Sequence, residues 1–253
     1  MRRLVLPFLH RSPPPLGEGH AVFLDIDGTL LELAPAPDAV HVDPELASLL
    51  PRLRKSLGGA LALITGRAIS DVDRLFPGLR MPVAGQHGCE RRDALGTLHL
   101  HAPRTATLER LRALFTDFAR SHEGLLLEDK GATLALHYRK APQLAAKVHR
   151  TMTEQVRAAG ITAYRLQTGK QLLELRPDNR DKGTAIRDFM RERPFKGRCP
   201  VFIGDDRTDE HGFAVIDTMG GWSVKVGPGR TRARYRLRDV RSVRAWLSAF
   251  GAR

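Results

Sequence analysis

Cysteine is scarce in this chain: Cys89 and Cys199 are the only two among 253 residues, and they lie far apart. Two isolated thiols provide no disulfide framework, no zinc motif and no CxxC redox motif. Long hydrophobic runs are also missing, since no stretch reaches the roughly eighteen apolar residues that a membrane helix needs. Met1–Leu9 is too short, and too soon followed by charged residues and prolines, to act as a signal h-region. We therefore expect a cytoplasmic protein with free thiols and no membrane partner.

Acidic residues are outnumbered: 28 Asp and Glu face 41 Lys and Arg, which gives a formal net charge of +13. Much of the excess lies between Lys225 and Arg253, where the arginines from Arg230 to Arg238 alternate with other residues. This period of two predicts a strand with a packed face and a solvated, arginine-rich face. A nucleic-acid-binding protein would also be basic, but no interleaved aromatic residues or binding motif accompany these arginines. We favour the solvated face and expect no nucleic-acid partner, although a positive protein also attracts small anionic substrates.

The composition is otherwise that of a globular protein, with 42% apolar and 27% charged residues. Three short apolar runs, each followed by a polar cluster, occur at residues 21–24, 61–64 and 200–203. Such runs are typical of strands buried on both faces of a parallel sheet. A helical stripe of leucines from Leu46 to Leu57 separates the first two runs, with Asp43 placed as its N-cap. This alternation predicts a doubly wound α/β core, which begins near His20 after an irregular lead-in at residues 1–19.

The middle of the chain has a different order of elements. Apolar periodicity predicts two helices, at residues 108–118 and 144–156. Segments with strand-like composition predict four short strands, at residues 125–127, 133–138, 161–166 and 171–175. The order helix, strand, strand, repeated once, is typical of an antiparallel α+β unit. We therefore predict an α+β cap domain at residues 103–176, inserted into a core formed by residues 20–102 and 177–253.

Acidic residues gather behind the first and the last of the three core strands. Asp25 and Asp27 follow the first strand, and the last is followed by Asp205, Asp206, Asp209 and Glu210. Two carboxylates two residues apart cannot easily both stay ionised in a cleft without a cation, and Mg²⁺ prefers oxygen ligands. Both clusters therefore fit one magnesium site. Asp206 or Thr208 could instead cap a helix N-terminus, and both interpretations can hold at once.

Two further residues fit a phosphoryl-transfer site, where catalysis is mostly positioning and charge neutralisation. Thr65, in Ile64-Thr65-Gly66-Arg67, ends the second core strand. Its hydroxyl and the nearby backbone N–H groups of Gly66 and Arg67 can bind a phosphoryl oxygen. Lys182 begins a predicted helix, where a cation gains nothing from the helix dipole. A bound anion nearby would explain that position.

In this order, the segment Asp25-Ile26-Asp27-Gly28-Thr29, the threonine, the lysine and the segment Gly204-Asp205-Asp206-Arg207-Thr208-Asp209 resemble the motifs of the HAD phosphatase superfamily. The resemblance implies that Asp25 is the nucleophile and forms an aspartyl-phosphate, while Asp27 acts as general acid and then as general base. It also implies Mg²⁺ held by the carboxylates of Asp25 and Asp205 and by the backbone carbonyl of Asp27, with Asp206 and Asp209 in support. By the DxD spacing alone, Asp27 is an equally plausible nucleophile.

Longer segments resemble one branch, the trehalose-6-phosphate phosphatase family, from about His20 to Phe250. Besides the motifs, the matching segments are Ala84-Gly85-Gln86-His87-Gly88-Cys89-Glu90-Arg91-Arg92 and Ala135-Leu136-His137-Tyr138-Arg139. The resemblance implies hydrolysis of trehalose 6-phosphate, the second step of trehalose biosynthesis, with a cap that reads the sugar. It assigns sugar binding to Glu128, Lys130 and Glu174. The segment Gln86-His87-Gly88 falls where core meets cap, and its glycines suggest close approach of the backbone to a ligand.

Several alternatives stay open. Glu128 and Glu174 could lie on a solvated strand face, and His87 could bind a hydroxyl or only pack. The same core motifs serve many substrates, so sucrose 6-phosphate or a mannosyl phosphate ester is an alternative, and a basic nucleic-acid-binding protein on a phosphatase scaffold is a remote one. One departure from the family is Asn179, where a glycine is usual; asparagine is the other residue that best tolerates positive φ. We expect a monomer that acts on a small sugar phosphate.

Overall fold

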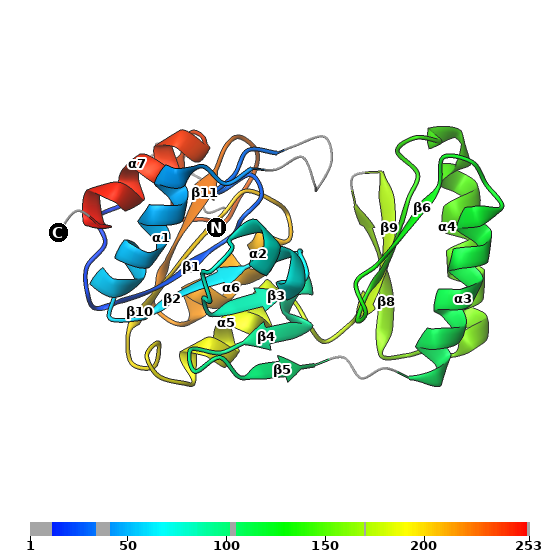
Figure 1. Cartoon of the computed structure of the whole chain (residues 1–253), viewed down its shortest axis with the longest axis horizontal. Coiled ribbons are helices and arrows are strands. Elements are labelled where there is room, and N and C mark those ends of the chain that lie inside the picture. The colour runs from blue at the N-terminus through cyan, green and yellow to red at the C-terminus, as the bar shows by residue number, and fades with distance from the viewer. Residues whose placement is uncertain (1–11, 34–40, 102–104, 170, 252–253) are drawn as a thin grey trace, which may run out of the picture. The chain divides into compact units, whose positions relative to one another are not determined.

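The computed structural model describes residues 12–33, 41–101, 105–169 and 171–251. The chain forms two compact units (Figure 1). The core unit comprises Met1–His99 and Asp181–Arg253, and the inserted unit comprises Leu100–Arg180. The predicted boundary at residue 176 falls inside the last strand of the inserted unit, and the predicted boundary at residue 103 lies outside the described residues.

The core unit is built on a mostly parallel sheet, as the alternation of apolar runs predicted. Its strand order is β12-β11-β10-β1-β2-β3-β4-β5. Strand β1 lies at the centre and pairs in parallel with β10 and β2. Among the pairs of this sheet with a described register, only the pair of β3 and β4 is antiparallel. The strands are β1 His20–Leu24, β2 Leu61–Ile64, β3 Val83–Gly85, β4 Glu90–Arg92, β5 Leu98–Leu100, β10 Cys199–Gly204, β11 Trp222–Val226 and β12 Tyr235–Leu237.

Helices cover both faces of this sheet, which confirms the doubly wound class. They are α1 Pro44–Ser56, α2 Ile69–Leu75, α5 Lys182–Met190, α6 Asp209–Thr218 and α7 Val240–Gly251, with a 3₁₀ turn, η2, at Gln86–Gly88. Successive residues of β1 face opposite sides: Val22 and Leu24 join the apolar cluster with α1, α2 and α7, whereas Ala21 and Phe23 join the cluster with α5 and α6. The central strands β1, β2, β10 and β11 are therefore buried on both faces, and only their ends are open to polar chemistry.

The inserted unit is an antiparallel sheet in the order β6-β7-β9-β8 with two helices on one face (Figure 1). Its elements are α3 Ala106–Arg120, β6 Leu126–Asp129, β7 Leu134–His137, a 3₁₀ turn η3 Pro142–Leu144, α4 Ala145–Ala159, β8 Tyr164–Gly169 and β9 Leu172–Pro177. Leu134 and Leu136 of β7, with Leu173 and Leu175 of β9, pack with residues of both helices. The residues between them therefore point to the opposite face of the sheet, which is polar.

Two expectations from the sequence need correction. The arginine-rich segment forms a strand only over Tyr235–Leu237. Strand β12 is parallel to β11, so the chain must first return to the start of β11, and residues 227–234 form that irregular connection. The described part of the N-terminal lead-in has no regular structure, but it is packed: Leu16 is buried in the core cluster, and Trp246 Nε1 donates to the carbonyl of Pro14. Residues 1–11 of the lead-in lie outside the described residues.

A search of the described helices for a membrane-spanning segment finds none that combines sufficient length with sufficient apolar character. Asn179 lies in the turn that follows β9, and it is not among the non-glycine residues with positive φ, which are Gln86, His87 and Gln171 in the described chain. The turn therefore does not use the tolerance of asparagine for that conformation.

Candidate active site

The turn after β1 places Asp25 at the carboxyl end of the central strand. The N–H of Asp25 donates to the carbonyl of Ile203 at 3.0 Å, which continues the β1–β10 ladder one residue beyond β1. Gly28 follows with φ +82°, and a Cβ at this position would lie 2.2 Å from Oδ2 of Asp205. Only glycine therefore lets the turn after β1 approach the carboxylate that follows β10.

Lys182 links the two acidic segments. As the first residue of α5, it lies beside its N-cap Asp181, whose side chain accepts from the N–H of Thr184. Its Nζ donates to Oδ1 of Asp25 at 2.8 Å and to Oδ1 of Asp209 at 2.7 Å. Burial alone would lower the pKa of Lys182, but the charges of Asp209 and Asp25 outweigh it and hold the pKa above its ordinary value. This lysine is therefore charged and fixes two carboxylates.

Three carboxylates form a group that could hold a metal ion. One oxygen each from Asp25, Asp205 and Asp209 lie within 4.8 Å of one another. Burial raises the pKa of Asp25 well above its ordinary value, and burial also raises the pKa of Asp205, with Asp209 adding to both. Carboxylates crowded and buried in this way are stabilised by a divalent cation with a preference for oxygen ligands. The residues present therefore fit such an ion. Asp206 is outside the group: its side chain is exposed and accepts from the N–H of Arg207.

Asp27 makes a contact that the sequence did not predict. Arg67 donates from Nε to Oδ2 of Asp27 at 2.7 Å and from Nη2 to Oδ1 at 2.6 Å, so the guanidinium holds both oxygens. The backbone N–H of Arg67 also donates to Oγ1 of Thr65 at 3.1 Å. Thr65 is buried at the end of β2. The segment that follows β2 thus supplies both a buried hydroxyl and the cation that contacts the second aspartate.

The segment Gln86–Gly88 lies against the same strand ends. The ring of His87 packs over Gly66, where a Cβ would lie 2.9 Å from Cε1 and Nε2 of the histidine. Gln86 and His87 have positive φ, a conformation that costs energy for residues other than glycine. Gln86 Nε2 donates to Oε1 of Glu90. The buried Oε1 of Gln86 itself makes no hydrogen bond to any residue the structure describes. Strain and an unused acceptor are typical of a binding segment.

A buried lysine beside the three carboxylates was not singled out from the sequence. Lys225, in β11, donates from Nζ to the backbone carbonyls of Asp205 and Val226. Burial lowers its pKa. It fixes the backbone that carries Asp205. A lysine in the mostly apolar segment Trp222-Ser223-Val224-Lys225-Val226 was the signal that could have revealed it.

The polar face of the inserted unit brings together the three residues predicted to bind a sugar. Glu128, Ala135 and Glu174 lie in one row across β6, β7 and β9. Lys130 Nζ lies 3.4 Å from Oε2 of Glu128 and 3.9 Å from Oε1 of Glu174. His137 Nε2 lies 2.9 Å from the same Oε2 of Glu128. Against the effect of burial, His137 and Lys130 hold the pKa of Glu128 below its ordinary value.

Two acceptors on this face are left for a ligand. Oε1 of Glu128 and Oε2 of Glu174 make no hydrogen bond or ion pair with a residue that the structure describes, although only 8% of the Glu174 side chain is exposed. A buried carboxylate whose nearest cation is 3.9 Å away is incompletely satisfied. Hydroxyl groups are suitable donors to both oxygens.

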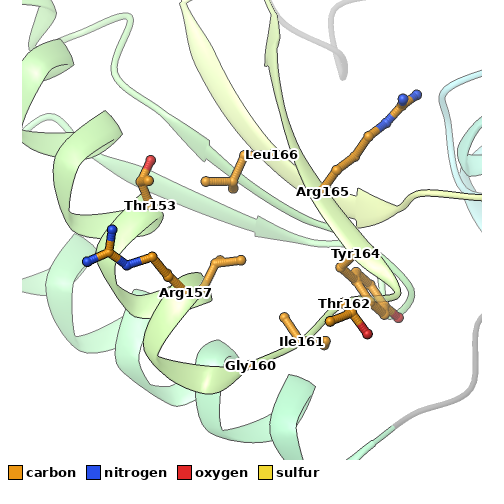
Figure 2. Close-up of a pocket in the computed structure, with 9 residues that line it drawn as sticks. Thr153, Arg157, Gly160, Ile161, Thr162, Tyr164, Arg165 and Leu166 are labelled. Carbon is orange, nitrogen blue, oxygen red and sulfur yellow. The ribbon is translucent and has the colours of Figure 1, made fainter.

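A separate hollow of about 380 Å³ lies in the inserted unit between the end of α4 and the start of β8 (Figure 2). Val156, Ile161 and Leu166 supply its apolar lining. None of its lining residues is acidic, and none belongs to the sets of residues described above. Its composition offers neither a nucleophile nor a metal ligand, so it does not enter the chemistry of the acidic group.

Comparison with known proteins identifies the family of this chain. A family model described as trehalose-phosphatase matches residues 23–241. A probable trehalose-phosphate phosphatase of Sinorhizobium fredii is 47% identical over 82% of this chain and 78% of its own length. The trehalose-6-phosphate phosphatase of Escherichia coli is 45% identical over 92% of this chain and 87% of its own.

Solved structures show the same fold. A trehalose-6-phosphate phosphatase related protein superimposes with a TM-score of 0.76 and 26% identity, covering 91% of this chain and 96% of its own. A haloacid dehalogenase-like hydrolase from B. subtilis, at 15% identity and a TM-score of 0.62, covers 90% and 99% and supports the fold alone. Since the family model spans most of the sequence and two relatives match nearly half of their aligned residues, the chain belongs to the trehalose-phosphatase family and is a phosphoric monoester hydrolase.

Proposed function

We propose that this enzyme hydrolyses trehalose 6-phosphate to trehalose and phosphate through a phosphorylated Asp25. The observation that carries the proposal is the pairing of a buried Asp25 with Lys182 at the end of β1, together with the acceptor face of the inserted unit. The names of the relatives supply the substrate. The core unit would perform the chemistry, and the inserted unit would select the sugar.

The first step is attack by a carboxylate oxygen of Asp25 on phosphorus. The bond between phosphorus and the sugar oxygen breaks, and Asp27 gives its proton to that oxygen. Thr65 would donate its hydroxyl to a phosphoryl oxygen, and Lys182, already 2.8 Å from Asp25, would neutralise charge beside the nucleophile. In the second step Asp27 takes a proton from water, the water oxygen attacks phosphorus, and Asp25 is released with phosphate as the product.

A divalent cation, for which we propose Mg²⁺, would be held by Asp25 and Asp205, with Asp209 close by. When bound, it supplies charge neutralisation for the phosphoryl group and for the acidic group itself. Gly28 leaves the space that Asp205 needs, and Lys225 fixes the backbone of Asp205. Asp206, to which the resemblance assigns a supporting role, is exposed and lies outside the group of three carboxylates.

On the inserted unit, the free oxygens of Glu128 and Glu174 would accept hydrogen bonds from sugar hydroxyls, and Lys130 would donate to one. His137 holds one oxygen of Glu128 at 2.9 Å and so directs the other outward. A disaccharide offers many hydroxyls, whereas a small phosphate ester offers few. The same face could read another sugar phosphate, which is the reason to test several.

We expect phosphate release in the presence of Mg²⁺ to be fastest, in terms of kcat/KM, with trehalose 6-phosphate in a panel that includes sucrose 6-phosphate, a mannose phosphate and 4-nitrophenyl phosphate. Chelation by EDTA should stop turnover of every substrate, because the crowded carboxylates need the cation, and added Mg²⁺ should restore it. A preference for sucrose 6-phosphate would replace the proposed substrate and keep the chemistry. Undiminished turnover in EDTA would contradict the role of the cation.

Arg67 has a proposed role that differs from phosphate binding, because its guanidinium holds both oxygens of Asp27. We expect Arg67→Met to slow hydrolysis of the sugar phosphate about 10²-fold, since a misplaced Asp27 delivers its proton poorly. The first step on 4-nitrophenyl phosphate, followed as the pre-steady-state release of 4-nitrophenolate, should suffer less, because 4-nitrophenolate leaves without a proton. Arg74→Met, at an exposed ion pair on α2, is the matched control and should behave as the unchanged enzyme. An equal loss in the first step on both substrates would show that Arg67 acts on the phosphoryl group instead.

A further inference from the structure

One side chain on the polar face of the inserted unit has no role in the function proposed above. Gln167 of β8 lies directly opposite Glu174 of β9. It therefore continues the row that begins with Glu128 and passes through Ala135. Figure 2 shows Arg165 pointing away from α4, on the other side of β8 from Leu166. Gln167, two residues further along the strand, shares that outward face.

The orientation of the Gln167 amide is determined by Arg176, which lies on the same face and is almost completely buried. Arg176 Nη1 donates to Oε1 of Gln167 at 3.0 Å, and Nη2 donates to the carbonyl of Arg180 at 2.6 Å. A guanidinium has only donors, so the amide atom that faces it must be the oxygen. The Nε2 group is consequently directed away from Arg176. It makes no hydrogen bond to any other residue in the described part of the chain.

The row therefore alternates in what it offers a ligand. Glu128 and Glu174 are acceptors, and Gln167 adds an amide with two free donor hydrogens beside Glu174. A sugar hydroxyl both donates and accepts, so a carboxylate next to an oriented amide can bind one hydroxyl or two adjacent ones through both functions. Lys130 offers the corresponding donor near Glu128. The face thus has at least one donor beside each carboxylate.

We propose that Gln167 is a specificity-determining residue, which donates from Nε2 to an oxygen of the sugar and is held in that orientation by Arg176. This inference rests on the proposed function, because it assumes that the polar face reads a sugar phosphate. It adds a residue that neither the sequence motifs nor the acidic residues of the face indicated. It also gives the buried Arg176 a purpose beyond its own packing.

The test compares Gln167→Glu and Gln167→Met. Glutamate keeps an oxygen for Arg176 but loses both donor hydrogens, and methionine loses both functions without adding charge. We expect each variant to raise the KM for trehalose 6-phosphate about tenfold with little change in kcat, as loss of uniform substrate binding does. The kinetics with 4-nitrophenyl phosphate should stay unchanged. Gln143→Glu, the same substitution on the exposed η3 turn, is the control.

Other outcomes would overturn the proposal. An unchanged KM in Gln167→Glu would mean that the residue only satisfies Arg176. A raised KM in Gln167→Glu but not in Gln167→Met would reflect added charge and not a lost donor. Equal losses on the sugar and aryl phosphates would place the effect in the core unit. The substrate preference of the unchanged enzyme tests the proposed function separately, and the two variants are then assayed on whichever sugar phosphate it prefers.

Discussion

Asp25→Asn is expected to reduce kcat for trehalose 6-phosphate by about 10⁴-fold or more, because an amide oxygen is a poor nucleophile and no phosphoenzyme can form. The fold should survive. Burial raises the pKa of Asp25, so the folded chain binds this proton more tightly than the unfolded chain, and stability falls as pH rises from about 3.9, the ordinary value, toward the raised one. At neutral pH the asparagine variant, measured without metal by urea unfolding, should be as stable as the unchanged enzyme or more stable.

The variant Asp27→Asn distinguishes the roles of Asp25 and Asp27. The DxD spacing alone left either aspartate as a plausible nucleophile. With 4-nitrophenyl phosphate, Asp27→Asn should still be phosphorylated, because the leaving group needs no proton, but the second step should be slow. The phosphoenzyme should then accumulate and be visible by intact mass after an acid quench. Asp117→Asn, at an exposed position of α3, should leave the kinetics unchanged. Turnover near the normal rate in Asp25→Asn, or a phosphoenzyme formed without Asp25, would remove Asp25 as the nucleophile.

The arrangement of the core was predictable because it follows from local patterns and one topological rule. Apolar runs that end in polar residues predict parallel strands, and the carboxyl ends of such strands meet at one edge of the sheet. The prediction that the acids after β1 and after β10 lie close together follows directly. The position of Lys182 at a helix start was likewise visible, since Asp181 and the apolar period after it mark the helix.

Contacts that depend on the path of individual side chains were not predictable. Arg67 and Asp27 are forty residues apart, and nothing local shows that the guanidinium turns to the carboxylate and not to a substrate. The pairing of Gln167 with Arg176 depends on the register of β8 against β9, which periodicity alone does not give. The alternating arginines after Gly227 gave too long a predicted strand for a related reason. Alternation indicates which side chains are exposed, but a strand also needs a neighbouring strand to pair with. Only Tyr235–Leu237 pairs with β11.

Lys182→Met is the second substitution with a large expected effect, and it acts on both stability and turnover. Lys182 is buried and is 2.8 Å from Asp25 and 2.7 Å from Asp209. Its removal leaves two buried carboxylates without their cation, which costs about 3–5 kcal/mol of unfolding free energy. The sign is clear: the pKa of Lys182 is raised on folding, so its contribution is complete below about pH 10, the unfolded range for lysine, and is lost only at higher pH.

Because Mg²⁺ can neutralise the same carboxylates, the ion should stabilise Lys182→Met more than the unchanged enzyme, and urea unfolding with and without Mg²⁺ measures the difference. In Mg²⁺ the turnover of Lys182→Met should remain at least about 10²-fold below that of the unchanged enzyme, since a charge beside the phosphoryl group is missing. Lys55→Met, at an exposed position of α1, is the matched control. Adding Asp209→Asn to Lys182→Met should recover part of the lost stability, because one unpaired carboxylate is then removed. If that double variant is less stable than Lys182→Met alone, the cost lies in packing around Lys182, and the lysine does not act mainly by balancing the acidic group.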